Sequence, residues 1–489
     1  MLKIVEKKKG GFLKKNLELF IFLAIFLLGV GLRLWKYPFY PLAANAEEYL
    51  FVWSGLSLIE KGVPISWNDI PVYPPETIYW QGVAKNLSGR GDLGVRLLKP
   101  WLDEPPLFSL MVGAVSKLYR AENFTIISNY IIRIPSLIIS FFCLALVYLV
   151  AKKLFGSQTA FLSLLIYATI PTIVFGSRLA VAENLITLFY LLVLFLVLNY
   201  FDSGKHWQRN LAIFFAGIAG LAKPTGFLLV PFLAFLLWTR KSWKEGVLSG
   251  LWGTLLFWVP FLSYGVYFGK ELFWKVMSYQ SQRPAGWSSL AYLTTNPGFS
   301  VEVFLDGFVI VGLLSLMFLF FKKREKAEDL LLFGFIFTLL TVLISGGRHD
   351  QLCWYRYPIY PFMAMSIALL VKELFAKPDF YRNAIFIPLF LANADLLENP
   401  FWQAKFLIEV KFYRAAFSLL LLPSILYLIF KKEFFQKLSR YAIITAFIAG
   451  ILINIWVIKS RFNLLCDHTD ECALPYKVNL LKPFVGGGN

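Results

Sequence analysis

The sequence predicts an all-α polytopic membrane protein, and this prediction comes from its composition and from the length of its apolar runs. Hydrophobic residues occupy 58% of the 489 positions, and the mean hydropathy is +0.63. A soluble domain is closer to half apolar and lacks repeated apolar runs of this length. Many of the runs approach the ~20 residues that a helix needs to cross a bilayer. The 49 Phe and 15 Trp residues are typical of lipid-facing surfaces and interfacial belts.

The net charge of +18 follows from membrane topology and not from binding of nucleic acid. Lysine and arginine lie mostly in short loops between apolar runs, as the positive-inside rule describes. We therefore expect the lipid bilayer as a partner and no nucleic acid. Four cysteines are too few for a disulfide framework, although Cys466 and Cys472 could close a small loop and Cys143 should pack within a span. No CxxC, Walker or dinucleotide-binding motif is present.

Alternating charge and hydropathy predict the order of the membrane segments. Residues 1–16 form a basic cytoplasmic N-terminus, and residues 17–35 form a first span that is too long for a signal-peptide core. Residues 36–133 form an outer catalytic loop, residues 134–458 a transmembrane bundle and residues 459–489 an outer C-terminal tail. About thirteen spans result, with the N-terminus in the cytoplasm and the C-terminus outside. After the first, they are expected at residues 134–150, 160–175, 185–201, a pair turning at Lys223-Pro224, 247–266, 301–321, 330–344, 357–371, 384–394, 417–430 and 442–458.

Two helices are expected within the outer loop, at residues 46–61 and 106–119. The second begins at Pro106, and proline suits the first turn of a helix. Its ~12 apolar residues are short for a span, so we expect it to lie at the membrane interface. Lys152 and Lys153 mark the cytoplasmic end of the next span, which also requires that this helix does not cross.

Acidic and basic side chains gather in the segments that this topology places outside. A carboxylate can remove a proton from an acceptor hydroxyl, and cations or a metal can stabilise a departing phosphate. This set therefore suits sugar transfer from a phosphate-linked lipid. The acids are Glu47, Glu48, Asp69, Glu76, Asp103, Glu104, Glu183 and Asp350, and the cations near span ends are Lys99, Arg133, Arg178, Lys223, Arg283, Arg348 and Arg356.

An ordered set of motifs between residues 40 and 230 resembles the GT-C glycosyltransferases. The similarity is to the branch that contains the dolichyl-phosphate-mannose-protein mannosyltransferases and the lipid A aminoarabinose transferases. No single motif is specific, but their order and spacing follow the family. The motifs are Glu47-Glu48 followed by Ser57–Gly62, Trp101–Phe108 with its acid-Pro-Pro, Arg133–Ser136, Lys152–Gly156, Ser177–Glu183, and the Lys-containing turn Leu221–Gly226.

The resemblance implies a GT-C-like fold, a polyprenyl-phosphate sugar donor, inversion at the anomeric carbon and an optional divalent metal (Mg, Mn or Zn). The family usually has Asp-Glu where this chain has Glu47-Glu48, and its first acid is the base. The site residues that we therefore predict are Glu47 and Glu48 for catalysis, Asp103, Glu104 and Glu183 for positioning the acceptor or a metal, with Glu104 as metal ligand, and Lys223, Arg283, Arg348 and Arg356 for the donor phosphate.

Several of the acids also have a purely structural interpretation. Asn45 and Glu48 match a capping box, in which Glu48 bonds back to the helix N-terminus and leaves Glu47 to face the cavity. Glu183 could pair with Arg178, although a spacing of five does not suit a helical pair.

The basic outer positions have the same double interpretation. Lys223 at its proline turn could be a lysine that reaches for the interface. Arg348 and Arg356 flank two aromatic residues, which suits an interfacial belt as well as a bidentate phosphate clamp. His349 with Asp350 alone provides too few ligands for zinc.

The resulting hypothesis is a glycosyltransferase with its site on the outer face of the plasma membrane. Its acceptor would carry a hydroxyl group on a protein, a glycolipid or a wall polymer. One alternative is a lipid-linked saccharide transporter or flippase, which would need paired charges near the midplane and broken helices in related halves. Another is a catalytically inactive homologue that binds polyprenyl lipid, because Glu47 stands where the family has Asp.

Overall fold

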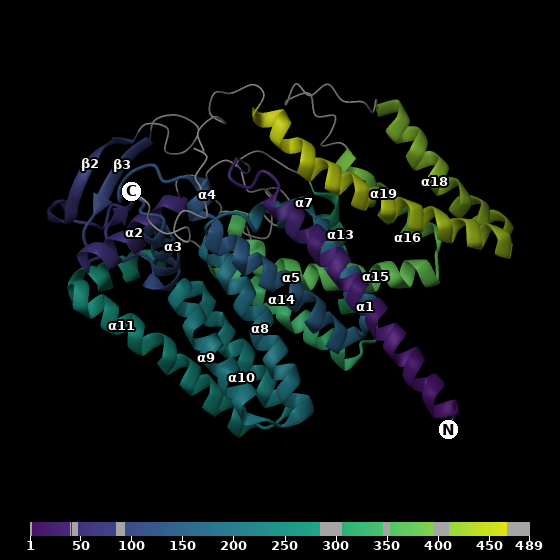
Figure 1. Cartoon of the computed structure of the whole chain (residues 1–489), viewed down its shortest axis with the longest axis horizontal. Coiled ribbons are helices and arrows are strands. Elements are labelled where there is room, and N and C mark those ends of the chain that lie inside the picture. The colour runs from purple at the N-terminus through teal and green to yellow at the C-terminus, as the bar shows by residue number, and fades with distance from the viewer. Residues whose placement is uncertain are drawn as a thin grey trace.

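The computed structural model is a helical bundle with a small sheet on one side (Figure 1). It describes residues 2–39, 41, 47–84, 93–283, 306–345, 353–394 and 410–466. The helices are α1 (Leu2–Leu34), α2 (Glu47–Lys61), α3 (Pro106–Leu118), α4 (Asn129–Ile132), α5 (Ile134–Phe155), α6 (Ser157–Thr169), α7 (Pro171–Gly176), α8 (Ala182–Ser203), α9 (His206–Ala222), α10 (Leu229–Arg240), α11 (Trp243–Ser281), α13 (Gly307–Phe321), α14 (Lys326–Ser345), α15 (Tyr360–Ala376), α16 (Phe380–Leu391), α18 (Val410–Phe430) and α19 (Glu433–Cys466). Short 3-10 turns are η1 (Pro75–Thr77), η2 (Pro224–Leu228), η3 (Cys353–Ile359) and η4 (Ala392–Ala394).

Among the described residues, 7 helices are long and apolar enough to cross a membrane. The predicted polytopic membrane protein is therefore confirmed, whereas the predicted number of about thirteen spans stays a prediction. The 7 segments are Asn16–Leu34, Asn129–Phe155, Ala182–Ser203, Trp243–Ser281, Lys326–Ile344, Trp354–Ala376 and Glu433–Ser460. Shorter apolar helices are Pro106–Leu118, Pro224–Arg240, Gly307–Phe321, Phe380–Leu391 and Arg414–Phe430.

Two segments differ from their expected bounds. The run expected at 160–175 is divided into α6 and α7, because Pro171 cannot continue the hydrogen-bond ladder and instead begins α7. The segment after the span expected at 247–266 was expected to be a loop. It is instead helical as far as the end of α11, which changes direction at Gly269 (φ 158°). The apolar side chains of Phe273 and Val276 explain this extension, because both are buried against residues of the 36–133 segment.

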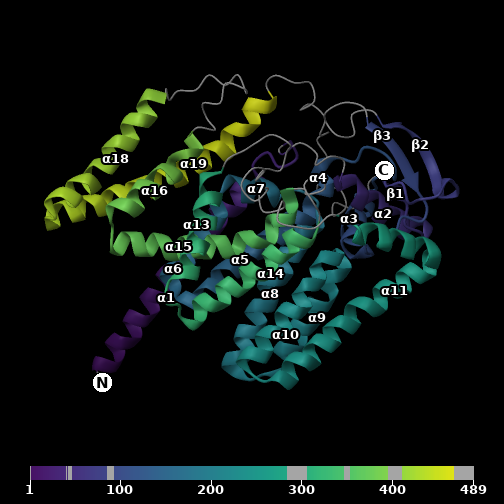
Figure 2. The same cartoon turned by 180° about the vertical axis from the view of Figure 1, so that it is seen from behind.

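The outer loop gathers at one side of the bundle, where α2 and α3 pack lengthwise beside the sheet (Figures 1 and 2). The two helices were predicted, but the sheet was not. Its strands β1 (Ser66–Trp67), β2 (Ile78–Ala84) and β3 (Leu93–Leu98) are antiparallel in the order β1-β3-β2. Leu98 and Trp101 pack against Leu50 of α2 and Val276 of α11, so the sheet region joins these two helices.

α2 and α3 cross at two glycines, which allows their backbones to touch. A Cβ atom at Gly113 would lie 2.7 Å from the Gly55 Cα, and one at Gly55 would overlap the backbone of Ser109. Only glycine permits so close an approach. Because Glu47 begins α2 and Glu104 precedes α3 by two residues, this crossing helps to set the distance between the two acids.

We expect Gly113→Ala to separate α2 from α3 and to destabilise the protein by about 1–3 kcal/mol, the usual cost of overpacking. Denaturant titration in detergent micelles would measure the loss. Gly31→Ala is the matched control, because a Cβ atom there has nothing within 4 Å. Equal stability of the two variants would show that the helix crossing tolerates a side chain.

Candidate active site

A buried ion pair fixes the start of α2. The side chains of Glu48 and Arg133 are both 0% exposed. Arg133 donates from Nε to Glu48 Oε1 (2.9 Å) and from Nη2 to Glu48 Oε2 (2.8 Å). The Ala180 amide also donates to Glu48 Oε1 (2.9 Å), and Arg133 Nη1 donates to the Tyr37 carbonyl oxygen (2.7 Å). The pair therefore joins the segment after α1, the start of α2, the start of α5 and the loop before α8.

Lys223 is the cation on which the acids converge. It is 4% exposed and lies where Pro224 begins η2 after α9. Its Nζ lies 2.8 Å from Glu183 Oε1, 3.6 Å from Glu104 Oε1 and 4.5 Å from the centre of the Tyr355 ring. Burial by itself lowers the pKa of this ammonium, but Glu183, Tyr355 and Glu104 raise the pKa well above its usual value. Lys223 is therefore a permanent positive charge at the centre of the site.

Glu47, the first residue of α2, belongs to the same electrostatic cluster. Its side chain is partly buried. Burial raises the pKa of its carboxyl to about 7 although Lys223 lowers it, and Glu183 and Glu104 raise it further. A carboxyl with a pKa near neutral pH suits a general base, because it can both take up and release a proton.

Asp103 and Glu104 lie on the turn between β3 and α3. The Tyr73 hydroxyl donates to Asp103 Oδ1 (2.8 Å) and accepts from the Leu102 amide (2.9 Å), which fixes this turn. Burial raises the pKa of each of the two carboxyls to about 7. One oxygen of Glu104 and one of Glu183 are buried with no hydrogen bond to the described residues. A hydroxyl of a ligand could donate to either oxygen.

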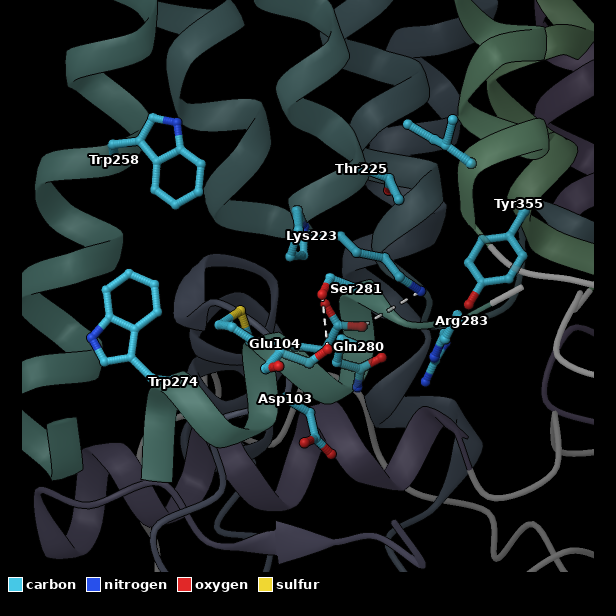
Figure 3. A pocket seen from close by; sticks show the side chains of 14 residues that line it. Asp103, Glu104, Lys223, Thr225, Trp258, Trp274, Gln280, Ser281, Arg283 and Tyr355 are labelled. Atoms are coloured by element: carbon cyan, nitrogen blue, oxygen red, sulfur yellow. Dashed lines mark hydrogen bonds and ion pairs between the residues drawn. The ribbon is translucent and has the colours of Figure 1, made fainter. Parts of the chain in front are cut away.

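Asp103, Glu104 and Lys223 line one part of a cavity of about 490 Å³. Figure 3 shows Trp258 and Trp274 on one side of the cavity, Arg283 and Tyr355 on the other, and Lys223 and Glu104 between them. The cavity therefore has a charged part and an aromatic wall, and its volume lies in the usual range for small-molecule sites. The lining residues are Asp103, Glu104, Lys223, Pro224, Thr225, Trp258, Trp274, Met277, Ser278, Gln280, Ser281, Arg283, Ile344 and Tyr355.

The structure brings together most of the predicted site residues, although they come from separate segments of the chain. Those in the cluster or its cavity are Glu47, Asp103, Glu104, Glu183, Lys223 and Arg283. Arg356 is buried in η3 next to Tyr355 but does not line the cavity. Arg348, His349 and Cys472 lie outside the described residues. The chemical role of each predicted residue stays a prediction.

Two of the expected structural pairings are replaced by others. Glu183 pairs with Lys223, whereas Arg178 Nη2 donates to the Leu32 carbonyl oxygen. Asn45 lies outside the described residues. Glu48, which a capping box would direct to its own helix, bonds to Arg133 and Ala180, because a charge buried this deeply needs a full counter-charge.

The described part of the chain contains no ready set of ligands for the metal that the family resemblance implies. There, no three His, Cys, Asp or Glu side chains are grouped so that they could hold a metal ion. The Lys223 ammonium takes the position between Glu104 and Glu183 that a cation would occupy. A divalent metal (Mg, Mn or Zn) stays a prediction, and we derive no step through it.

Tyr355, Trp258 and Trp274 are site residues that the sequence analysis did not identify. Tyr355 was interpreted as part of an interfacial belt. Trp258 was an ordinary apolar residue of the span expected at 247–266, and Trp274 lay in the segment after that span. The signal for Tyr355 was its place beside Arg356 after a basic loop. For the tryptophans no sequence signal exists, because the change of direction at Gly269 brings Trp274 to the cavity that Trp258 also lines.

Comparison with known proteins identifies the fold. Residues 103–264 match the family described as dolichyl-phosphate-mannose-protein mannosyltransferase. ArnT from Cupriavidus metallidurans, solved bound to undecaprenyl phosphate, superposes with a TM-score of 0.54 and 15% identity, over 91% of this chain and 77% of that chain. The chain has the GT-C fold. The expected likeness to protein mannosyltransferases and to ArnT is confirmed.

The comparison gives two further matches. The arabinosyltransferase EmbB from Mycobacterium smegmatis has a TM-score of 0.55 and 10% identity, over 91% of this chain and 41% of that chain. An uncharacterized protein of Aquifex aeolicus (strain VF5) is 25% identical over 352 residues, which are 68% of this chain and 66% of the relative. At such low identities the structural similarity establishes the GT-C fold, and the donor and acceptor have to be argued from the site.

We expect Arg133→Met to destabilise the protein by about 3–5 kcal/mol, because it leaves the Glu48 carboxylate buried without its partner. The matched control is Lys117→Met, which breaks an ion pair between α3 and Glu60 of α2 that is partly exposed to solvent. That loss should stay within about 1 kcal/mol. Denaturant titration of both variants would measure the difference, and similar losses would contradict the special role of the buried pair.

Proposed function

We infer that this GT-C protein transfers a sugar from a polyprenyl-phosphate donor to a hydroxyl acceptor, with inversion at the anomeric carbon. The observation that carries this inference is one cavity in which the buried ammonium of Lys223, held by Glu104 and Glu183, faces an aromatic wall. A phosphate-linked lipid is amphipathic in the same way. The fold shared with ArnT, which was solved with undecaprenyl phosphate, supports the same donor class.

The donor phosphate fits the positive part of the cavity. Lys223 and Arg283 both line it, and the Tyr355 side chain lies beside them (Figure 3). An ammonium and a guanidinium stabilise phosphate oxygens by charge-assisted hydrogen bonds. Trp258 and Trp274 on the opposite wall provide apolar surface for the first part of the prenyl chain.

The reaction then needs one proton acceptor and one stabiliser of negative charge. The Glu47 carboxylate takes the proton from the acceptor hydroxyl, whose oxygen forms a bond to the anomeric carbon. The bond between that carbon and the phosphate oxygen breaks, and its electron pair leaves with the polyprenyl phosphate. Lys223 and Arg283 stabilise the charge that develops on the phosphate. Attack and departure on opposite faces of the sugar give inversion.

The remaining acids position these groups. Glu183 and Glu104 hold the ammonium of Lys223, and each keeps one buried oxygen for a hydroxyl of the sugar or the acceptor. Asp103 is fixed by Tyr73 and supports the turn that carries Glu104. The acceptor class is a hydroxyl group on a protein, a glycolipid or a wall polymer.

The proposed location is the outer face of the plasma membrane. The chain is a multi-pass membrane protein. The site lies where α8 begins, and the opposite end of α8 is followed by Lys205 in the turn to α9 and by Arg209 in the first turn of α9. The positive-inside rule supports a cytoplasmic position for these basic residues, and with it an N-terminus inside and a site outside.

We expect Glu47→Gln to lower turnover by about 10²- to 10⁴-fold, the usual contribution of a general base. The measurement is transfer of radiolabelled sugar from a polyprenyl-phosphate donor by purified protein. In the wild type, Glu47 is neutral below its raised pKa of about 7, so kcat/KM should increase as pH increases through this value. Glu47→Gln should lose this pH dependence along with its rate.

The exposed acid Glu76, also in the outer loop, provides the control for this experiment. Glu76→Gln should keep both the rate and the pH profile of the wild type. Wild-type turnover in Glu47→Gln would remove Glu47 from the mechanism. Absence of sugar transfer by the wild type would instead favour a transporter or an inactive lipid-binding homologue.

We expect Arg283→Gln to raise KM for the donor by roughly tenfold, because one charge-assisted hydrogen bond to phosphate contributes about 1.5–3 kcal/mol. The partly buried side chain should make its effect on folding small. Steady-state kinetics with varied donor would measure the change. Lys275→Gln, which changes an exposed cation of α11, should leave KM unchanged. If both variants raised KM equally, the increase would come from the loss of positive charge in general and not from the loss of a phosphate contact.

A further inference from the structure

We propose that two turns at the other end of the bundle form a binding site for the headgroup of an anionic phospholipid. The turns join α8 to α9 and α10 to α11, and in both views they lie together at the lower edge of the bundle (Figures 1 and 2). Five cations lie in these turns or in the helix ends beside them, and they are called the basic face below. They are Lys205, Arg209, Arg240, Lys241 and Lys244. The basic face is independent of the sugar-transfer site and of its proposed chemistry.

The two turns pack against each other around one aromatic ring. The Lys241 Nζ lies 4.9 Å from the centre of the Tyr200 ring, and the Arg209 guanidinium carbon lies 6.0 Å from it. The Tyr200 hydroxyl donates to Glu245 Oε2 (2.8 Å) at the start of α11. Cations from separate turns are thus held close together by tertiary contacts, and not only by their proximity in sequence.

Acids balance only part of the charge of the basic face. Elsewhere at this end, Lys152 pairs with Glu18 and Lys322 pairs with Glu328. Lys205, Lys241 and Lys244 are exposed, and in the part of the chain that the structure describes none of them has an ion pair with a carboxylate. Glu245 is shared between Tyr200 and Arg209, and Asp202 pairs with Lys153. A ligand with a phosphate group would supply the missing negative charge.

Three exposed tryptophans give the depth of the basic face in the membrane. Trp207, Trp238 and Trp243 are 55%, 58% and 59% exposed, and each lies within two residues of a cation of the face. Exposed Trp of this kind is enriched at the level of lipid headgroups. Basic clusters between transmembrane helices at this level bind acidic headgroups. The chemistry therefore favours a lipid phosphate over a soluble acidic partner.

Distance separates this site from the acid cluster. Glu183 and Tyr200 lie 17 positions apart on α8, which at the helical rise corresponds to about 26 Å. A variant of the basic face therefore leaves the carboxylates and Lys223 in place. Binding of lipid and transfer of sugar can be tested separately.

The test uses the full chain in nanodiscs that contain equal amounts of phosphatidylcholine and phosphatidylglycerol, followed by native mass spectrometry of the retained lipid. The wild type should retain phosphatidylglycerol preferentially. Lys205→Gln/Lys241→Gln should weaken this preference by about 25-fold, since each basic residue near an anionic surface contributes about 1 kcal/mol. Lys205→Arg/Lys241→Arg should restore the preference. The matched control is Lys431→Gln/Lys432→Gln, which removes two exposed lysines from the turn between α18 and α19.

Each outcome decides the proposal. Loss of preference in Lys205→Gln/Lys241→Gln alone supports it. Equal retention in this variant and the wild type overturns it, and an equal loss in the control shows general attraction to a positive surface. Release of the lipid by an excess of soluble glycerol phosphate would assign the site to a free phosphate compound. Thermal unfolding of all variants should be unchanged, because the substituted side chains are exposed.

Discussion

The ion pair between Glu48 and Arg133 is the interaction on which the geometry of this site depends. Two charges without access to water are tolerated only when every polar atom has a partner, and breaking such a pair costs more than the pair itself contributes. Arg133 satisfies both oxygens of Glu48, and the Ala180 amide adds a third hydrogen bond. Because these groups belong to four separate segments, the start of α2 has one permitted position. Glu47, the residue before Glu48, is placed by this constraint.

Adjacent residues of one helix therefore have opposite functions. Successive positions on an α-helix point about 100° apart, so Glu48 can face the interior while Glu47 faces the acid cluster. In the part of the chain that the structure describes, Glu47 has no ion pair of its own, and it shares the field of Lys223 with Glu104 and Glu183. With three carboxylates around one ammonium, repulsion and burial both raise the pKa of Glu47. The excess of carboxylates over ammonium groups therefore helps to give Glu47 a pKa that suits a base near neutral pH.

Sequence analysis could predict what depends on local pattern and could not predict what depends on contacts between distant segments. The apolar runs predicted most of the helices, and the acids at the start of α2 and before α3 predicted the position of the site. The sheet was missed because β2 and β3 are short and joined by a pairing that hydropathy does not indicate. The partners of Glu48 and Glu183 were missed because each is tens of residues away, 85 positions for Glu48 and 40 for Glu183. A nearby residue, such as Arg178, was the obvious but wrong partner.

Breaks in the helices explain how so many polar groups can meet at one end of a membrane bundle. A continuous helix presents only its side chains, whereas an interrupted one leaves backbone groups that lipid cannot satisfy. Here α9 ends before Pro224, and the Gly226 amide bonds to the Lys223 carbonyl oxygen (2.8 Å), so η2 satisfies part of the interrupted backbone. α6 also gives way to α7 at Pro171, and α11 turns at Gly269. The break at Pro224 places Lys223 at a helix end beside the cavity, and the turn at Gly269 brings the second tryptophan to its wall. These interruptions therefore create the polar cavity instead of weakening the bundle.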